Sequence, residues 1–214
     1  MVEGDYTAYV RGVLDRVFED SRRYLEERDQ VRDTAIKVSR DVIRLSGWAV
    51  TEYHKGDKGK AREYLRQAAE KAAEFLSLIK PYPELYYSGM AYNALSEYVE
   101  AAVFIAIAER ESIPLPEELG VPPVPYLQGL GDVVGELRRL VLEKIRQEDF
   151  EEAWRLFRVM ESIYLYLRGL DFPEAIAPGI RHKADVARRL TDDTKAFLVD
   201  MESRHKLTSL LNKR

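Results

Sequence analysis

The sequence predicts an all-α protein, a bundle of about six to seven helices. Apolar residues recur every three or four positions along most of the 214-residue chain, which is the spacing of one face of a helix. No segment shows the convincing alternation of apolar and polar residues that is typical of strands. Prolines and glycines gather between the periodic segments, where they would end helices. Since 46% of the residues are hydrophobic, we expect one domain with a sizeable core across residues 1–214.

The first half of the chain divides into three predicted helices. Residues 5–55 contain no proline and form one long helix or two nearly continuous ones, ended by a glycine-containing turn at residues 56–59. The next helix covers about residues 60–79. It ends at the two prolines within residues 80–83, because proline disfavours a helical conformation in the residue before it. A third helix runs from about residue 84 to residue 111.

The second half begins with residues 113–125, which contain too many prolines for a helix. Three more helices are predicted at about residues 126–145, 149–168 and 180–211, with a loop at residues 171–179. The first of these contains three glycines, and each costs up to ~1 kcal/mol of helix stability relative to alanine. We therefore expect another backbone to come close at these positions. The glycines are Gly129, Gly131 and Gly135.

Composition limits the possible classes of protein. Cysteine is absent, which excludes disulfides and zinc-thiolate sites and fits a reducing compartment. No stretch reaches the ~18 apolar residues of a membrane span, and the polar N-terminus is unlike a signal peptide. We therefore expect a cytoplasmic protein that does not contact membranes. With 33 basic and 37 acidic residues, any contact with nucleic acid must be local.

The most informative stretch is residues 91–108, which has no wide polar face and is therefore expected to form a buried helix. It nevertheless contains Glu97 and Glu100. At this spacing both carboxyl groups project from one side of the helix, with their Cβ atoms about 5–6 Å apart. Because two buried like charges repel, at least one carboxyl must keep its proton, or a cation must lie between them. A metal ion is the simpler explanation.

A second acidic pair, Asp132 and Glu136, lies on one face of the predicted helix at residues 126–145, among leucines and valines. Two antiparallel helices that each present two acids could form a pocket of oxygen ligands, which suits Mg²⁺ or Mn²⁺. Such ions bind phosphates and lower the pKa of bound water, as phosphodiester hydrolysis requires. The alternative is a di-iron site, which needs two Glu-x-x-His motifs. Only Glu202 and His205 form one.

Basic residues form two candidate contacts for phosphate. Arg138 and Arg139 lie beside the second acidic pair, and a second group follows Gly179 at the start of the last predicted helix. Positive charge at that end opposes the helix dipole, and a phosphate ligand would relieve the conflict. Such runs are more often solvated helix faces. His54 is equally compatible with a structural and a catalytic role. The predicted nucleic-acid contacts are Arg139, Arg181, Lys183, Arg188 and Arg189.

Four motifs resemble the translin family, and specifically its translin-associated factor X (Trax) branch. The resemblance covers nearly the whole chain after about Tyr24. The chain departs from the family pattern at Gln128 and Val134, where leucine and threonine are usual, and neither change affects an acid. The motifs are Ser39-Arg40-Asp41, His54-Lys55, Glu97-Tyr-Val-Glu-Ala101 and Tyr126-Leu-Gln-Gly-Leu-Gly-Asp-Val-Val-Gly-Glu-Leu-Arg138.

The resemblance implies a subunit of about seven helices that assembles into a hollow octameric barrel, here a homo-oligomer. It also implies a Mg²⁺- or Mn²⁺-dependent endoribonuclease that cleaves single-stranded or small duplex RNA. The catalytic acids of the family match Glu97, Glu100 and Asp132, and a further acid matches Glu136. All four are therefore expected to hold the metal.

Two other functions are compatible with the sequence. The first is a non-catalytic, translin-like protein that binds RNA or single-stranded DNA and keeps the acids as structural remnants. The second is an oligomeric scaffold that binds no nucleic acid. The first predicts binding without cleavage in Mg²⁺ or Mn²⁺, whereas the second predicts no retardation of RNA even at low salt.

Overall fold

The computed structural model describes residues 3–211, and within this range it contains eight helices and no strand, which confirms the predicted all-α fold. Among these residues, no helix combines the length and the apolar character needed to cross a membrane. The helices are α1 (Glu3–His54), α2 (Lys58–Ile79), α3 (Pro83–Tyr86), α4 (Gly89–Glu109), α5 (Pro116–Leu119), α6 (Pro123–Arg146), α7 (Phe150–Arg168) and α8 (Ile180–Leu211).

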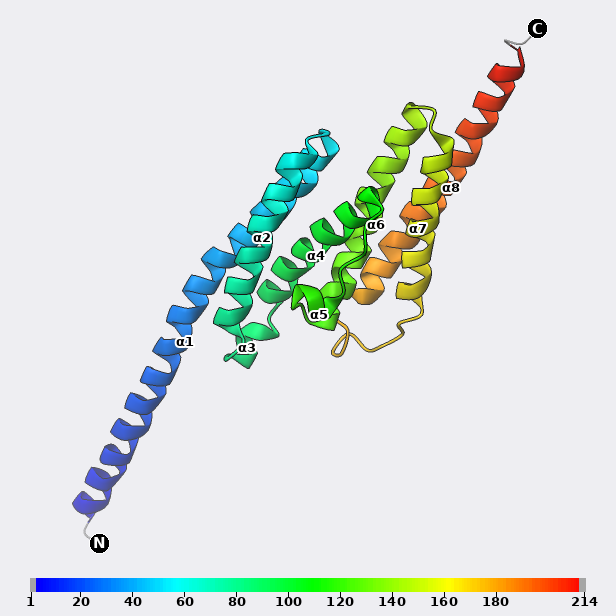
Figure 1. The fold of residues 1–214 in the computed structure, drawn as a ribbon. Helices are drawn as coiled ribbons and strands as arrows, with labels where there is room; N and C mark the ends of the chain where they lie inside the picture. Colours follow the sequence, from blue (N-terminus) through cyan, green and yellow to red (C-terminus); the bar gives the residue numbers. More distant parts are fainter. Residues whose placement is uncertain (1–2, 212–214) are drawn as a thin grey trace.

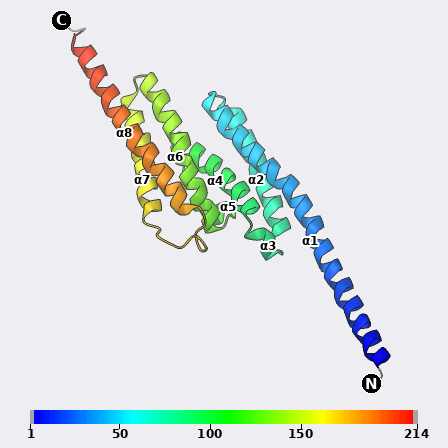
Figure 2. The same cartoon turned by 180° about the vertical axis from the view of Figure 1, so that it is seen from behind.

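Helix α4 lies at the centre of the bundle. Helices α1 and α2 pack on one side of it and α6 on the other, and α7 and α8 pack against α6 (Figure 1). Nearly every residue of α4 from Ala91 to Ile107 is buried or half-buried, as its apolar sequence predicts. The two termini lie at opposite ends of the molecule, where the first part of α1 and the last part of α8 extend beyond the bundle (Figure 2).

The segment predicted at residues 5–55 forms a single uninterrupted helix, Glu3–His54, which is one of the two possibilities that the sequence allowed. Its second half packs into the core from Ala35 onward. Its first half exposes large apolar side chains that recur at helical spacing, and we call this surface the α1 apolar face. Its residues are Tyr6, Tyr9, Val13, Leu14, Val17, Phe18, Tyr24 and Leu25.

The predicted helix at residues 84–111 is interrupted, because α3 ends before Ser88 and α4 begins after it. The hydroxyl of Ser88 accepts a hydrogen bond from the backbone N–H of Ala91 over 3.2 Å. This bond caps the first turn of α4, since it satisfies one of the N–H groups that a helix start leaves unpaired.

The proline-rich segment contains more helix than predicted. Pro116 opens the short helix α5, and α6 begins at Pro123, before the expected residue 126. The prediction treated proline only as a helix breaker. Proline is tolerated in the first turn, because its missing N–H would have no partner there and its φ angle already suits a helix.

Helices α4 and α6 run in the same direction, and not antiparallel as the sequence analysis assumed. Gly129, near the start of α6, lies against Ser96 in the first half of α4. Leu140, near the end of α6, lines the same cavity as Ala108 at the end of α4. The connection that contains α5 carries the chain back along α4 before α6 begins (Figure 1).

The glycines of α6 confirm the expected close approach at two of three positions. A Cβ atom at Gly129 would lie 2.7 Å from the backbone oxygen of Ser96, and one at Gly131 would lie 2.7 Å from Cβ of Lys183. At Gly135 the expectation is wrong, because a Cβ atom there would meet nothing within 4 Å.

This difference gives a matched pair of substitutions. We expect Gly129→Ala to lower the free energy of unfolding by about 1–3 kcal/mol, because the added methyl group has no room beside the α4 backbone. Gly135→Ala should raise it by up to ~1 kcal/mol through helix propensity. Urea unfolding followed by circular dichroism at one protein concentration measures both. Equal effects of the two substitutions would contradict the close packing at Gly129.

Candidate functional site

The four predicted acids meet where α4 packs on α6. Glu97, Glu100 and Glu136 line one small cavity of about 160 Å³. Asp132 lies close enough that its negative charge raises the pKa of both Glu97 and Glu100. Residues from the last part of α1, together with Arg139, complete the cavity. These α1 residues are Ser46, Gly47, Val50 and Thr51.

Local structure explains how the two acidic pairs meet. Gly129 has no side chain, so α6 approaches α4 closely at Ser96 and Val99. Asp132 follows Gly129 by three residues, about one helical turn, and therefore faces the same neighbour. Because α4 and α6 run in the same direction, Asp132 and Glu136 lie along the same stretch of the helix interface as Glu97 and Glu100.

Of these four acids, Glu97 and Glu100 form no ion pair with the residues that the structure describes, whereas Asp132 and Glu136 do. Burial raises the pKa of Glu97, and repulsion from Asp132 adds to the effect. For Glu100, burial followed by repulsion from the other acids raises the pKa to about 8. Near neutral pH these two side chains therefore resist carrying negative charge together.

The two acids of α6 are held by basic side chains. Asp132 accepts a hydrogen bond from the ammonium group of Lys183. Glu136 Oε2 accepts a hydrogen bond from His54 Nε2 over 2.6 Å and one from the Arg139 guanidinium over 3.0 Å. Burial alone would raise the pKa of Glu136, but His54 and Arg139 outweigh it and bring the pKa below its ordinary value.

His54 belongs to the site rather than to an unrelated part of the core. It is the last residue of α1, and its ring stacks on Phe104 of α4 with centroids 5.0 Å apart. This packing fixes the ring while Nε2 contacts Glu136. The sequence alone did not show this pair, because 82 residues separate its members.

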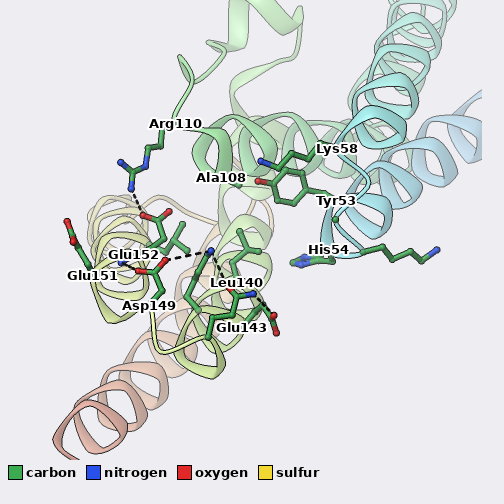
Figure 3. Close-up of a pocket in the computed structure, with 15 residues that line it drawn as sticks. Tyr53, His54, Lys58, Ala108, Arg110, Leu140, Glu143, Asp149, Glu151 and Glu152 are labelled. Carbon is green, nitrogen blue, oxygen red and sulfur yellow. Dashed lines mark hydrogen bonds and ion pairs between the residues drawn. The ribbon is translucent and has the colours of Figure 1, made fainter. Parts of the chain in front are cut away.

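A second, larger cavity of about 700 Å³ lies on another side of His54, between the ends of α1, α4 and α6 and the start of α7 (Figure 3). Sequence analysis did not identify it, since its lining comes from the ends of five separate helices, α2 included. Its charges are largely balanced within the protein. Arg110 pairs with Glu152 at 2.6 Å, and Lys144 lies 3.8 Å from Asp149. The cavity therefore offers an anion little unpaired positive charge.

The predicted basic contacts separate into two groups. Arg139 and Lys183 touch the acids of α6, so the structure brings them into the site. The other three are exposed on α8 and contact none of the four acids. Those three are Arg181, Arg188 and Arg189.

The Glu-x-x-His pair of α8 takes no part in the acidic site. Glu202 accepts a hydrogen bond from the indole N–H of Trp154 and pairs with Lys206. The ring of His205 packs against Phe150 with centroids 5.0 Å apart. Both side chains are therefore engaged at the other end of α8.

Within residues 3–211, no three acidic or histidine side chains already converge as metal ligands. Asp132 and Glu136 instead contact the basic side chains of Lys183 and Arg139. The chemistry of the side chains nevertheless fits a hard divalent ion. All four donors are carboxyl groups, and the raised pKa values of Glu97 and Glu100 show that no neighbouring cation fully compensates their charge when they ionise, as a bound divalent ion would.

Comparisons with known proteins found a family profile and a similar archaeal protein. The Translin family profile matches residues 30–191. An uncharacterized protein of Methanocaldococcus jannaschii is 31% identical over 192 residues, which cover 89% of this chain and 85% of that protein.

Solved structures of C3PO proteins have the same fold. AfC3PO in a complex with duplex RNA is 33% identical with a TM-score of 0.79, and a crystal structure of AfC3PO is 32% identical with a TM-score of 0.80. Each match covers 87% of this chain and 97% of the other. Apo-NeC3PO is 26% identical with a TM-score of 0.73, over 88% of this chain and 96% of the other.

Proposed function

The chain belongs to the translin family, and from this premise we propose that it is a metal-dependent endoribonuclease of the Trax type. The observation that carries the proposal is the meeting of three carboxyl groups from α4 and α6 in one small cavity, with the carboxylate of Asp132 close enough to repel two of them. Burial and mutual repulsion raise the pKa of Glu100 there to about 8. Apolar residues at these positions would often make a protein equally or more stable. The acids therefore serve a purpose other than stability.

In this proposal Glu97, Glu100 and Asp132 hold a Mg²⁺ or Mn²⁺ ion. Glu136 is a further ligand or orients the attacking water, and the contacts from His54 and Arg139 fix its position. The bound ion would lower the pKa of its water and neutralise charge on the scissile phosphate. The surrounding apolar residues of α4 and α6 bury much of Glu97 and Glu100, which strengthens their electrostatic contacts.

RNA is the proposed substrate, either single-stranded or a small duplex. Support comes from AfC3PO, whose structure was solved with duplex RNA. Arg139 lies at the acids, 58% exposed at its side chain, and can reach a phosphate beside the cavity. The exposed arginines of α8 are proposed to contact the RNA backbone farther away. They are Arg181, Arg188 and Arg189.

We also propose that the protein forms a homo-oligomer, with the octamer of the family as the expected state. The α1 apolar face supports this, because it extends beyond the bundle and exposes eight large apolar side chains on one helix. A surface of this kind marks a protein–protein contact. Each subunit would then contribute an active site.

The alternative is a translin-like protein that binds RNA or single-stranded DNA without cleaving it. One observation favours it: Asp132 and Glu136 already have cationic partners in Lys183 and Arg139, which is how structural acids are held.

One assay separates these functions. Purified protein is incubated with labelled single- and double-stranded RNA in EDTA, Mg²⁺ or Mn²⁺, and both retardation and cleavage are followed. We expect retardation in all three solutions and cleavage only with metal. Retardation without cleavage in either metal would favour the non-catalytic binder. No retardation at low salt would leave only the oligomeric scaffold.

A further inference from the structure

Lys183 is the one basic residue of α8 that reaches the acids. Its ammonium group forms a hydrogen bond and an ion pair with Asp132, which lies 51 residues earlier in the chain. Its positive charge also partly offsets the rise in the pKa of Glu97 and Glu100. The cation therefore acts on three of the four acids, although it belongs to a different helix.

The start of α8 is held so that Lys183 enters the site. The side-chain amide of Gln128 donates a hydrogen bond to the backbone oxygen of Pro178 over 2.6 Å. Gly179 then turns the chain into α8 with a φ angle of +74°, a conformation that favours glycine. Gly131 leaves room for the Lys183 stem, since a Cβ atom there would lie 2.7 Å from Cβ of Lys183.

Stability alone does not account for this arrangement. The side chains of Lys183 and Asp132 are 30% and 28% exposed, and partly exposed ion pairs contribute little net stability. Gly131 in the interior of α6 costs up to ~1 kcal/mol relative to alanine. The helix thus carries a destabilising residue at the position that admits the lysine stem.

We propose that Lys183 is a built-in counter-ion of the acidic site, whose ammonium group occupies Asp132 until a divalent cation displaces it. The inference rests on the proposed metal-dependent function. It explains why the acids do not converge as ligands within the described residues, because Asp132 is turned toward the lysine. The lysine stem is flexible enough to release the carboxylate, whereas an arginine fork would hold it more firmly.

The test measures Mn²⁺ binding without RNA, so it does not depend on catalysis. Free Mn²⁺ is followed by electron paramagnetic resonance during titration of full-length wild type, Lys183→Met and Lys183→Arg at one pH. We expect Lys183→Met to bind Mn²⁺ about tenfold more tightly, because no ammonium competes for Asp132 and one repelling charge is gone. Lys183→Arg should bind it more weakly than wild type, because arginine grips a carboxylate at two points.

Lys195→Met is the matched control. Lys195 also lies on α8 and pairs with an acid of another helix, Glu161, at 2.9 Å, away from the four acids. Its removal should change the Mn²⁺ dissociation constant by less than about twofold, because solvent and salt screen distant charges. Circular dichroism melting in EDTA establishes that each variant is folded. If Lys183→Met does not fold, the weaker binding of Lys183→Arg decides.

The outcomes are distinct. Unchanged or weaker Mn²⁺ binding by folded Lys183→Met, or equal tightening by Lys195→Met, would overturn the role of Lys183 while the proposed metal site stood. Mn²⁺ binding by Lys183→Met, with no detectable binding by wild type, would support the role of Lys183. If neither wild type nor Lys183→Met binds Mn²⁺, the proposed metal-dependent function fails, and with it the inference.

Discussion

Glu97→Gln is expected to reduce RNA cleavage by about 10³-fold or more and to leave RNA binding nearly unchanged. The amide keeps the size of the side chain and removes its charge. A metal ligand is then lost, together with several kcal/mol of transition-state stabilisation, and each 1.36 kcal/mol corresponds to a tenfold change in rate. Binding should persist, because phosphate contacts come from basic residues elsewhere.

Single-turnover cleavage in Mn²⁺ with excess protein measures the rate, and retardation in EDTA measures the affinity for RNA. Glu111→Gln is a suitable control, because Glu111 follows α4, is about half-exposed and pairs with Arg62 outside the cavity. It should cleave within about twofold of wild type, since surface ion pairs contribute little. Metal-dependent cleavage at the wild-type rate by Glu97→Gln would remove Glu97 from the mechanism.

The second large effect concerns pH. Without metal, the wild-type protein should lose stability as pH rises from about 5 to about 8.5, and Glu100→Gln should lose much less. The folded pKa of Glu100 is about 8, against an ordinary value of 4.5, because burial and the neighbouring acids disfavour its charge. The protonated form is therefore favoured in the folded state, and this advantage is complete below pH 4.5 and lost as pH rises through 8. At 1.36 kcal/mol per pKa unit, the upper limit is about 5 kcal/mol.

Urea unfolding in EDTA at pH 5.5, 7.0 and 8.5 measures this difference. At pH 8.5 Glu100→Gln should be more stable than wild type by several kcal/mol, and the gap should narrow toward pH 5.5. Glu143→Gln is the control, because Arg146 and Gln147 lower the pKa of exposed Glu143 to about 2 and it stays charged throughout. A gap between Glu100→Gln and wild type that does not change with pH would show that Glu100 does not titrate in this range.

Several features of the fold follow from short stretches of sequence. The periodic apolar residues predicted the helices, and the apolar stretch around Glu97 predicted that α4 is buried. Their boundaries were harder to predict, because proline can begin a helix as well as end one, and Ser88 interrupts a helix whose apolar pattern continues. The glycines of α6 indicated close packing without identifying the neighbour.

In the candidate site, too, some features follow from the sequence and others only from the tertiary structure. Sequence alone determined that each acidic pair lies on one face of its helix, because the helical period fixes side chains three or four residues apart. Only the tertiary structure decided that α4 and α6 run in the same direction, that His54 holds Glu136, and that Lys183 holds Asp132. These contacts join distant segments through the packing of whole helices, and the charge pattern along one helix does not reveal which residue it faces.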